Sequence, residues 1–280
     1  MRVAITGASG FVGRHVLNAL SAHDLEIVAV TREADRLAGV QPSVQVVEMD
    51  IGESGINAFA KLGSPEVLIH LAWDGLPNYR SLHHFESELP RQYRFLKNLI
   101  ESGLPSILVA GTCFEYGLQS GALAADTRTL PDNPYGYAKD ALRKQLQFLQ
   151  SMTHFHLTWA RLFYMFGEGQ PSSSLYPKLR EAVYRGDSMF NMSGGEQLRD
   201  YLRVEEVARQ IVHLALGRQD VGIVNICSGN PVSVRKIVEE WLRENSWEIK
   251  LNLGYYPYPD YEPMAFWGKG TPFDLIPEHR

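Results

Sequence analysis

Two side chains suited to proton transfer, Tyr135 and Lys139, stand four residues apart in the segment NPYGYAK at positions 133–139. On a helix, side chains at this spacing share one face, so the phenol and the ammonium would point into the same cleft. A nearby ammonium lowers the pKa of a phenol and lets it exchange a proton with a carbonyl or hydroxyl group near neutral pH. The pair predicts acid–base chemistry at such a group, although YxxxK also occurs by chance.

A glycine-rich segment, TGASGFVG at positions 6–13, stands between a short apolar run and a helical pattern. A tight strand-to-helix turn needs glycine where φ is positive, where a phosphate approaches the backbone and where the helix packs closely on the strand. The helix N-terminus then offers N–H groups and the positive end of its dipole to a pyrophosphate. In this context, the spacing of Gly7, Gly10 and Gly13 predicts a dinucleotide site rather than a plain turn.

The end of the second apolar run indicates which dinucleotide is preferred. An acidic residue there would bind the ribose 2′-hydroxyl of NAD, but this chain has Thr31 and Arg32. A guanidinium suits the 2′-phosphate of NADP through its charge and its paired hydrogen bonds. We therefore predict NADP (NADPH) as the favoured cofactor, with NAD possible, because Glu33 follows directly and Arg32 could also be a solvated surface residue.

The elements that must position these residues alternate between short apolar runs and amphipathic stretches, which is typical of parallel βαβ units. Strands are expected at 3–6, 26–30, 44–47, 67–70, 107–110, 157–161 and 223–226. Helices are expected from Phe11, Ile56 and Arg91, and over 135–150, 204–215 and 232–243. These elements predict an α/β fold, a Rossmann doubly wound parallel sheet with a smaller C-terminal substrate-binding lobe. The NAD(P)-binding core would cover residues 1–165 with a returning segment near 200–232. Residues 166–280 would mainly form the substrate lobe, with an irregular tail.

The composition argues against several classes of function. The 280 residues are 45% apolar, and a net charge of −5 argues against a nucleic-acid partner or a membrane-surface partner. The first apolar run is too short for a signal peptide or a membrane span. Cys113 and Cys227 lack metal-site spacing, and we interpret them as reduced thiols in a cytoplasmic protein.

The histidines suggest no metal site. His154 and His156 alternate along one expected strand, but no third ligand follows at a suitable spacing. The adjacent His83 and His84 stand at a helix entry, where we interpret them as a surface or loop feature.

These motifs resemble those of the extended short-chain dehydrogenase/reductase family, specifically its NAD(P)-dependent nucleotide-sugar epimerases, dehydratases and ketoreductases. The resemblance runs through nearly the whole chain. TGASGFVG is similar to the family's cofactor turn, HLAW at 70–73 to its HLAA segment, GTCFEYG at 111–117 to its S/T-x-x-x-Y-G segment and RLFYMFG at 161–167 to its RxxNVYG segment. The cofactor contacts that this resemblance implies are Gly7, Ser9, Gly10, Phe11, Val12, Gly13, Arg32, Asp50, Ile51, Leu71, Ala72, Trp73, Tyr135 and Lys139.

The resemblance also implies roles on the substrate side. Thr112 would hydrogen-bond the reacting oxygen beside Tyr135 and Lys139, which completes the catalytic set. GGEQLRDY at 194–201 resembles a GxQxRDF segment, whose arginine, here Arg199, meets the substrate diphosphate. A guanidinium fork fits a diphosphate well, although Arg199 could instead pair with the adjacent Asp200. The other expected substrate contacts are Trp73, within the distinctive 73–79 stretch, and Thr112, at the end of a strand.

Several departures from the family pattern narrow the function. Cys113 and Phe114 replace the Asp-Glu pair that family dehydratases use to eliminate water, which argues against a 4,6-dehydratase. Gln92 and Tyr164 each stand where many members have asparagine, so the exact substrate stays open.

The leading hypothesis is NADPH-dependent reduction of the 4-keto group of a nucleotide-linked 4-keto-6-deoxyhexose, with Tyr135 as proton donor. Among such substrates, a dTDP-sugar is favoured. One alternative is an NAD-dependent nucleotide-sugar 4-epimerase. Another, from a different class, is a non-catalytic NADP-binding regulatory protein, which would have no need of the Thr112, Tyr135 and Lys139 set. A homodimer is expected, because helices of the fourth and fifth βα units often form a dimer interface in families of this kind.

Overall fold

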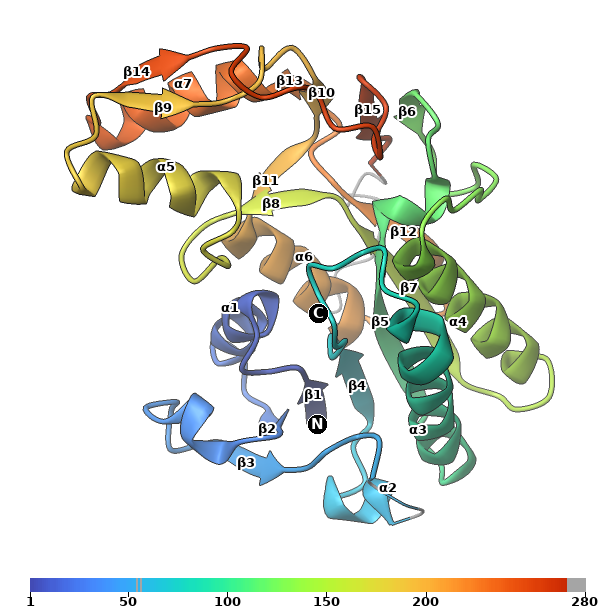
Figure 1. Ribbon diagram of the computed structural model, residues 1–280. Coiled ribbons are helices and arrows are strands. Elements are labelled where there is room, and N and C mark those ends of the chain that lie inside the picture. Colours follow the sequence, from blue (N-terminus) through green and yellow to red (C-terminus); the bar gives the residue numbers. More distant parts are fainter. Residues whose placement is uncertain (54, 56, 271–280) are drawn as a thin grey trace.

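A seven-stranded parallel sheet forms the centre of the computed structural model, which describes residues 1–53, 55 and 57–270 (Figure 1). The strand order is β12-β7-β5-β4-β1-β2-β3. The strands are β1 (Arg2–Thr6), β2 (Glu26–Thr31), β3 (Val44–Glu48), β4 (Val67–His70), β5 (Ser106–Thr112), β7 (His156–Leu162) and β12 (Gly222–Ile226). The order reverses between β1 and β4, and doubly wound sheets bind ligands outside the carboxyl ends of the strands at such a reversal. The predicted α/β Rossmann fold is confirmed.

Helices cover both faces of this sheet (Figure 1). Because strand side chains alternate between faces, Val3 and Ile5 pack toward α1 (Phe11–Leu20) and α6 (Val204–Leu216). Ala4 and Val28 face the opposite layer, which contains α2 (Ala58–Lys61), α3 (Leu89–Glu101) and α4 (Pro134–Gln150). Two apolar cores therefore hold the carboxyl ends of β1, β4 and β5 in fixed positions.

A second group of elements lies beyond those carboxyl ends (Figure 1). It includes β8 (Tyr164–Phe166), α5 (Leu175–Tyr184), β9 (Met189–Asn191), β10 (Leu198–Arg199), β11 (Tyr201–Arg203), β13 (Val232–Ser233), α7 (Val234–Asn245) and β14 (Lys250–Asn252). Phe166, Leu179 and Trp241 belong to its separate buried core. Two short strands, β6 (Gly121–Leu123) and β15 (Phe266–Gly268), pair in parallel and bring the tail next to the sheet.

Some expected boundaries differ from the structure. The helix expected from Arg91 begins at Leu89 and follows directly on a π-helical turn, η2 (His84–Glu88), which buries His84 completely. The interpretation of His84 as a surface or loop residue was therefore wrong. The expected start at Ile56 lies outside the described residues, and α2 is only four residues long. The tail, expected to be irregular, contains β14 and β15.

Within residues 1–53, 55 and 57–270, no helix is both long enough and apolar enough to span a bilayer.

Candidate active site

The glycine turn after β1 is held by close backbone contacts. Gly7 has a φ of +71°, and a Cβ atom there would lie 2.8 Å from the Ala72 nitrogen. A Cβ at Gly13 would lie 2.0 Å from the Gly7 carbonyl oxygen, so α1 packs directly on the turn. Gly10 is the N-cap of α1 and offers no side-chain acceptor to the first-turn N–H groups. Those groups, at the positive end of the helix, suit a pyrophosphate.

A cavity of about 220 Å³ lies beside this turn, at the reversal of strand order. Nine of the predicted cofactor residues line it: Gly7, Ser9, Gly10, Arg32, Asp50, Ile51, Leu71, Ala72 and Trp73. Phe11, Val12 and Gly13 form the first turn of α1 next to it. The residues present therefore fit a dinucleotide.

The end of this cavity near β2 is polar. Ser9 and Thr31 exchange a hydrogen bond between their hydroxyl oxygens at 3.1 Å. Arg32, about half-exposed, lies 3.5 Å from the Asp74 carboxylate, so a charge of opposite sign already faces its guanidinium. Arg36 also lines the cavity. This end thus presents arginines to a ribose or phosphate, with Asp74 partly neutralising one of them.

Thr112 and Tyr135 meet where β5 ends and α4 begins. Asn133 caps α4 by accepting a hydrogen bond from the Gly136 N–H at 2.9 Å, which places Tyr135 in the first turn. A Cβ at Gly136 would lie 2.5 Å from the Phe114 carbonyl oxygen, so α4 is packed tightly against the segment after Thr112. Burial raises the pKa of the Tyr135 phenol, so the expectation that the Lys139 ammonium lowers it was wrong; a hydrogen bond with the Thr112 side chain opposes the rise. At neutral pH the phenol is protonated, as a proton donor must be.

Lys139 lies one turn further along α4 and is also buried. Its ammonium donates a hydrogen bond to the Ala110 carbonyl oxygen at 2.9 Å, and Nζ lies 3.9 Å from the centroid of the Trp73 ring. Burial lowers the pKa of Lys139 to about 7, while the carboxylates of Glu115 and Glu88 act in the opposite direction. The predicted catalytic residues Thr112, Tyr135 and Lys139 are therefore brought together at the carboxyl end of β5.

An aromatic wall surrounds Tyr135. Its ring centroid lies 5.3 Å from that of His84, 5.6 Å from that of Tyr79 and 6.0 Å from that of Trp73. Phe114, from the segment after β5, lies at 6.3 Å. Most of these rings come from the 73–84 segment, so the distinctive 73–79 stretch does reach Tyr135. The phenol therefore lies in largely apolar, aromatic surroundings.

Glu115 is a fully buried residue that sequence reasoning missed. Its carboxylate accepts hydrogen bonds from the backbone N–H of Thr112 at 2.9 Å and from Arg161 at 2.7 Å. It also accepts the indole N–H of Trp159 at 2.9 Å. The signal was present, because Thr112 and Glu115 have the T-x-x-E spacing of a capping box, which the structure forms. Glu115 fixes the backbone that presents the Thr112 hydroxyl.

Arg199, the predicted diphosphate residue, has a carboxylate partner from the tail. The Glu262 oxygen Oε2 accepts hydrogen bonds from its Nη2 at 2.9 Å and from its Nε at 3.3 Å, while the Tyr164 hydroxyl donates to the other oxygen. The adjacent Asp200, the alternative partner weighed from sequence, instead accepts from the backbone of Ser228 and Gly229. Arg199 is thus a buried cation paired with a carboxylate of the tail.

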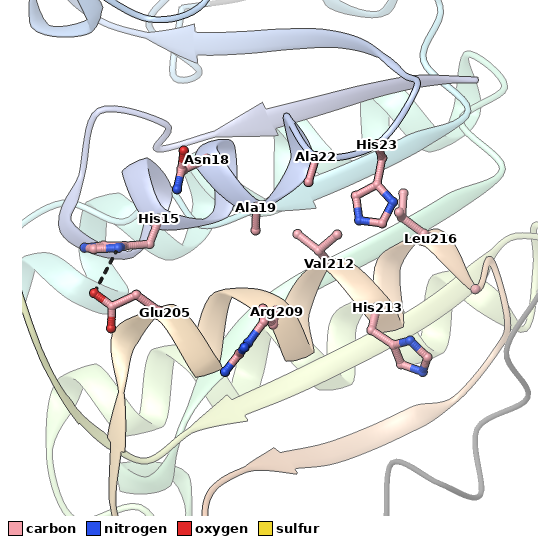
Figure 2. A pocket seen from close by; sticks show the side chains of 11 residues that line it. His15, Asn18, Ala19, Ala22, His23, Glu205, Arg209, Val212, His213 and Leu216 are labelled. Atoms are coloured by element: carbon pink, nitrogen blue, oxygen red, sulfur yellow. Dashed lines mark ion pairs between the residues drawn. The ribbon is translucent and has the colours of Figure 1, made fainter.

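A second cavity, of about 730 Å³, lies away from these residues, between α1 and α6 (Figure 2). Its walls include His15, Glu205 and Arg209, and one ion pair joins His15 to Glu205 at 3.7 Å. Neither the glycine turn nor Thr112, Tyr135 or Lys139 contributes to it. Across residues 1–53, 55 and 57–270, no group of three or more His, Cys, Asp or Glu is placed to hold a metal ion. The predicted cofactor residues gather instead at the cavity beside the glycine turn.

The chain is similar to known proteins over most of its length. The model of a family described as the NAD dependent epimerase/dehydratase family matches residues 3–227. The chain is 32% identical over 270 residues to dTDP-6-deoxy-L-talose 4-dehydrogenase (NAD(+)) of Aggregatibacter actinomycetemcomitans, covering 96% of this chain and 99% of that protein. It is 23% identical to UDP-glucose 4-epimerase of Halalkalibacterium halodurans, covering 85% and 79%. Among solved structures, UDP-N-acetylglucosamine 4-epimerase from Methanobrevibacter ruminantium superposes with a TM-score of 0.87 at 18% identity, covering 99% and 92% of the chains.

Proposed function

This chain belongs to the NAD dependent epimerase/dehydratase family, and we propose that it reduces the 4-keto group of a nucleotide-linked 4-keto-6-deoxyhexose, with a dTDP-sugar as the favoured substrate. The observation behind the proposal is the buried Thr112, Tyr135 and Lys139 cluster beside the dinucleotide cavity. The relative named for action at position 4 of dTDP-6-deoxy-L-talose supports the position and the nucleotide. A 4-dehydrogenase and a 4-ketoreductase catalyse the two directions of one reaction.

The side chains divide the reduction between them. A bound nicotinamide dinucleotide would supply the hydride that adds to C4. Tyr135 would donate its phenolic proton to the carbonyl oxygen, which becomes the new hydroxyl group. Thr112 would hydrogen-bond the same oxygen and orient it. The Lys139 ammonium would favour the phenolate left behind, since opposite charges in a buried site attract strongly.

The proposed cofactor preference is NADPH. Thr31, not a carboxylate, ends β2, and both Arg32 and Arg36 line the adjacent end of the cavity. These guanidinium groups suit a 2′-phosphate better than a free 2′-hydroxyl. The name of the 32% identical relative specifies NAD(+), so tighter binding of NADH would assign NAD to this chain as well.

Arg199 is proposed to bind the substrate diphosphate. Its guanidinium is now neutralised by Glu262, so a diphosphate would have to exchange with that carboxylate. Such an exchange replaces one charge-assisted pair by another inside the protein. The tail would stay attached to β10, because the Leu198 N–H donates to the Met264 carbonyl oxygen at 2.9 Å independently of the Arg199 side chain.

A second candidate function is 4-epimerisation with a retained NAD. The 23% identical UDP-glucose 4-epimerase favours it, since a retained NAD would take up and return the hydride while the same three side chains would move the proton. An epimerase consumes no cofactor overall, whereas a ketoreductase oxidises one NADPH for each sugar. A non-catalytic regulatory protein is less well supported, because buried Tyr135 and Lys139 would then have no chemical role.

We also propose a homodimer through α3 and α4. These helices contact each other on one side of the sheet, and α4 leaves Tyr137 and Phe148 exposed at 54% and 74%. The two residues are eleven positions apart, so they lie on one face of the helix. Sedimentation analysis of the native chain and of Phe148→Glu tests this, with a monomer expected for the variant.

The function itself is tested by incubating the protein with NADPH or NADH and a panel of nucleotide-linked keto sugars. Loss of cofactor absorbance with formation of a reduced sugar supports the ketoreductase. Interconversion of two nucleotide sugars without net cofactor loss would support the epimerase. Cofactor binding with neither result would favour the regulatory alternative.

A further inference from the structure

Trp73 stands at the junction between the cofactor cavity and the catalytic residues. It lines the cavity, and its ring lies against the Lys139 ammonium and forms an edge contact with Tyr135. Trp73 occupies the place of the last residue of the family's HLAA segment, where the side chain is small. An indole at this position therefore adds a wall between dinucleotide and proton donor.

The backbone on both sides of Trp73 is fixed by two buried side chains of one helical stretch. The Gln92 amide N–H donates to the Ala72 carbonyl oxygen at 3.1 Å, and Glu88 accepts from the Asp74 N–H at 3.1 Å. Gln92 also donates to Glu88 and accepts from His70, so the pair is itself held in place. These bonds fix the Trp73 backbone but leave the rotation of its ring to be set by another group.

That group is His84, whose protonation state follows from its two neighbours. The Trp73 indole N–H can only donate, so the His84 Nδ1 atom, 3.1 Å away, must accept. The His84 Nε2 atom therefore bears the proton and donates it to the Asn78 carbonyl oxygen at 2.8 Å. Only the neutral ring in this one tautomer satisfies both contacts.

We propose that His84 is a positioning residue that holds the Trp73 indole against the Lys139 ammonium and so shapes the nicotinamide end of the cofactor cavity. This inference rests on the proposed function, because it assigns the cavity to the dinucleotide. An ammonium over an indole face is attracted by the ring, which favours the charged form of Lys139 and its position beneath the ring. If the ring rotated away, the buried ammonium would lose this contact.

The arrangement has a built-in dependence on pH. The charged and titratable groups facing His84 are His83, just before η2, Glu88 from η2, and Lys139 and Tyr135 from α4, and the Trp73 indole N–H donates to Nδ1 of His84 rather than to any of them. Burial keeps the pKa of His84 below its ordinary value. Once His84 is protonated, its Nδ1–H would face the indole N–H, two donors would oppose each other, and a second cation would stand near Lys139. Acid is therefore expected to release Trp73.

A double-mutant cycle on the full chain tests the proposal, with the dissociation constants of NADPH and NADH as the readout. His84→Phe retains a ring beside Tyr135 but loses both hydrogen bonds. Trp73→Phe retains a ring over Lys139 but loses the donor. Each single variant is expected to bind the cofactor roughly three- to thirty-fold more weakly than the native protein. The double variant should bind no more weakly than whichever single variant binds more weakly. Fully additive losses would overturn the proposal, since His84 would then act independently of Trp73.

A second arm uses the pH profile with a matched control. His84→Gln can accept from Trp73 and donate to Asn78 but does not titrate. It should bind the cofactor as the native protein does at neutral pH and lose the weakening of binding in acid. His83→Gln, at the neighbouring histidine, should retain that weakening. Persistence of the acid limb in His84→Gln would contradict the proposal. Because both arms measure cofactor binding, they stay informative if no keto sugar proves to be a substrate.

Discussion

Arg199 and Glu262 form a buried ion pair in which two guanidinium nitrogens share one carboxylate oxygen, at 2.9 and 3.3 Å, although the residues are 63 positions apart. The pair joins β10 to the tail. It also sets a condition for binding an anionic substrate, because the cation proposed to meet the diphosphate already has a partner.

The first prediction follows from this pair. Glu262→Gln removes the competing charge and should tighten dTDP binding roughly ten-fold, the effect expected when one charge-assisted bond becomes available. Arg199→Ala should weaken dTDP binding by a similar factor. Titration calorimetry measures both, with thermal unfolding as a check on folding. Glu196→Gln, which loses the exposed contact with Tyr258, is the control. Weaker dTDP binding by Glu262→Gln would mean that the carboxylate itself contacts the substrate.

The second prediction concerns the cofactor. Arg32→Ala should weaken NADPH binding roughly ten-fold and leave NADH binding nearly unchanged, because only NADPH has the 2′-phosphate that this arginine would contact. Asp74→Asn should act in the opposite direction, since it removes the carboxylate that now faces Arg32. Fluorescence titration of both cofactors measures the effects. Equal affinities of NADPH and NADH for the native chain would remove the basis of the NADP preference.

The third prediction concerns the glycine turn. Gly13→Ala places a Cβ 2.0 Å from the Gly7 carbonyl oxygen, so α1 must move and dinucleotide binding should fall at least ten-fold. Gly217→Ala is the control, because the atom nearest to its added Cβ would be 3.4 Å away and its backbone is helical. Native-like cofactor binding by Gly13→Ala would show that the turn tolerates a side chain.

Much of the sheet and most of the site could be predicted because they depend on local rules. The glycine spacing, the buried strands and the Tyr135–Lys139 pair each follow from the chain within a few residues. The partners that come from distant segments could not be predicted in this way. Glu262 reaches Arg199 because the tail pairs with β10 at Leu198, whose N–H donates to the Met264 carbonyl oxygen, and His84 is buried by a π-helical turn that has no clear sequence signal. The domain division at residue 165, the cytoplasmic location and the dimer stay predictions.

The fourth prediction is a pH dependence set by Lys139, whose pKa burial lowers to about 7. If reduction needs the ammonium, kcat/KM at saturating cofactor should be steady just below that pH and fall about ten-fold for each unit above it. Tyr135 does not produce this limb, because burial raises its pKa. Lys139→Arg stays charged and should move the limb out of this range, whatever its absolute rate. An unchanged alkaline limb in that variant would assign it to another group.

The fifth prediction tests the central claim, that Tyr135 donates the proton during hydride transfer at a sugar carbonyl. Tyr135→Phe removes a single hydroxyl group from a buried aromatic wall, so folding and cofactor binding should survive, which circular dichroism and fluorescence titration can verify. The decisive measurement is the single-turnover rate of hydride transfer from the bound cofactor to a dTDP-linked 4-keto-6-deoxyhexose. The variant should be about 10²- to 10⁴-fold slower than the native protein, the usual cost of losing a positioned proton donor. Hydride transfer at the native rate by Tyr135→Phe would contradict the proposed mechanism.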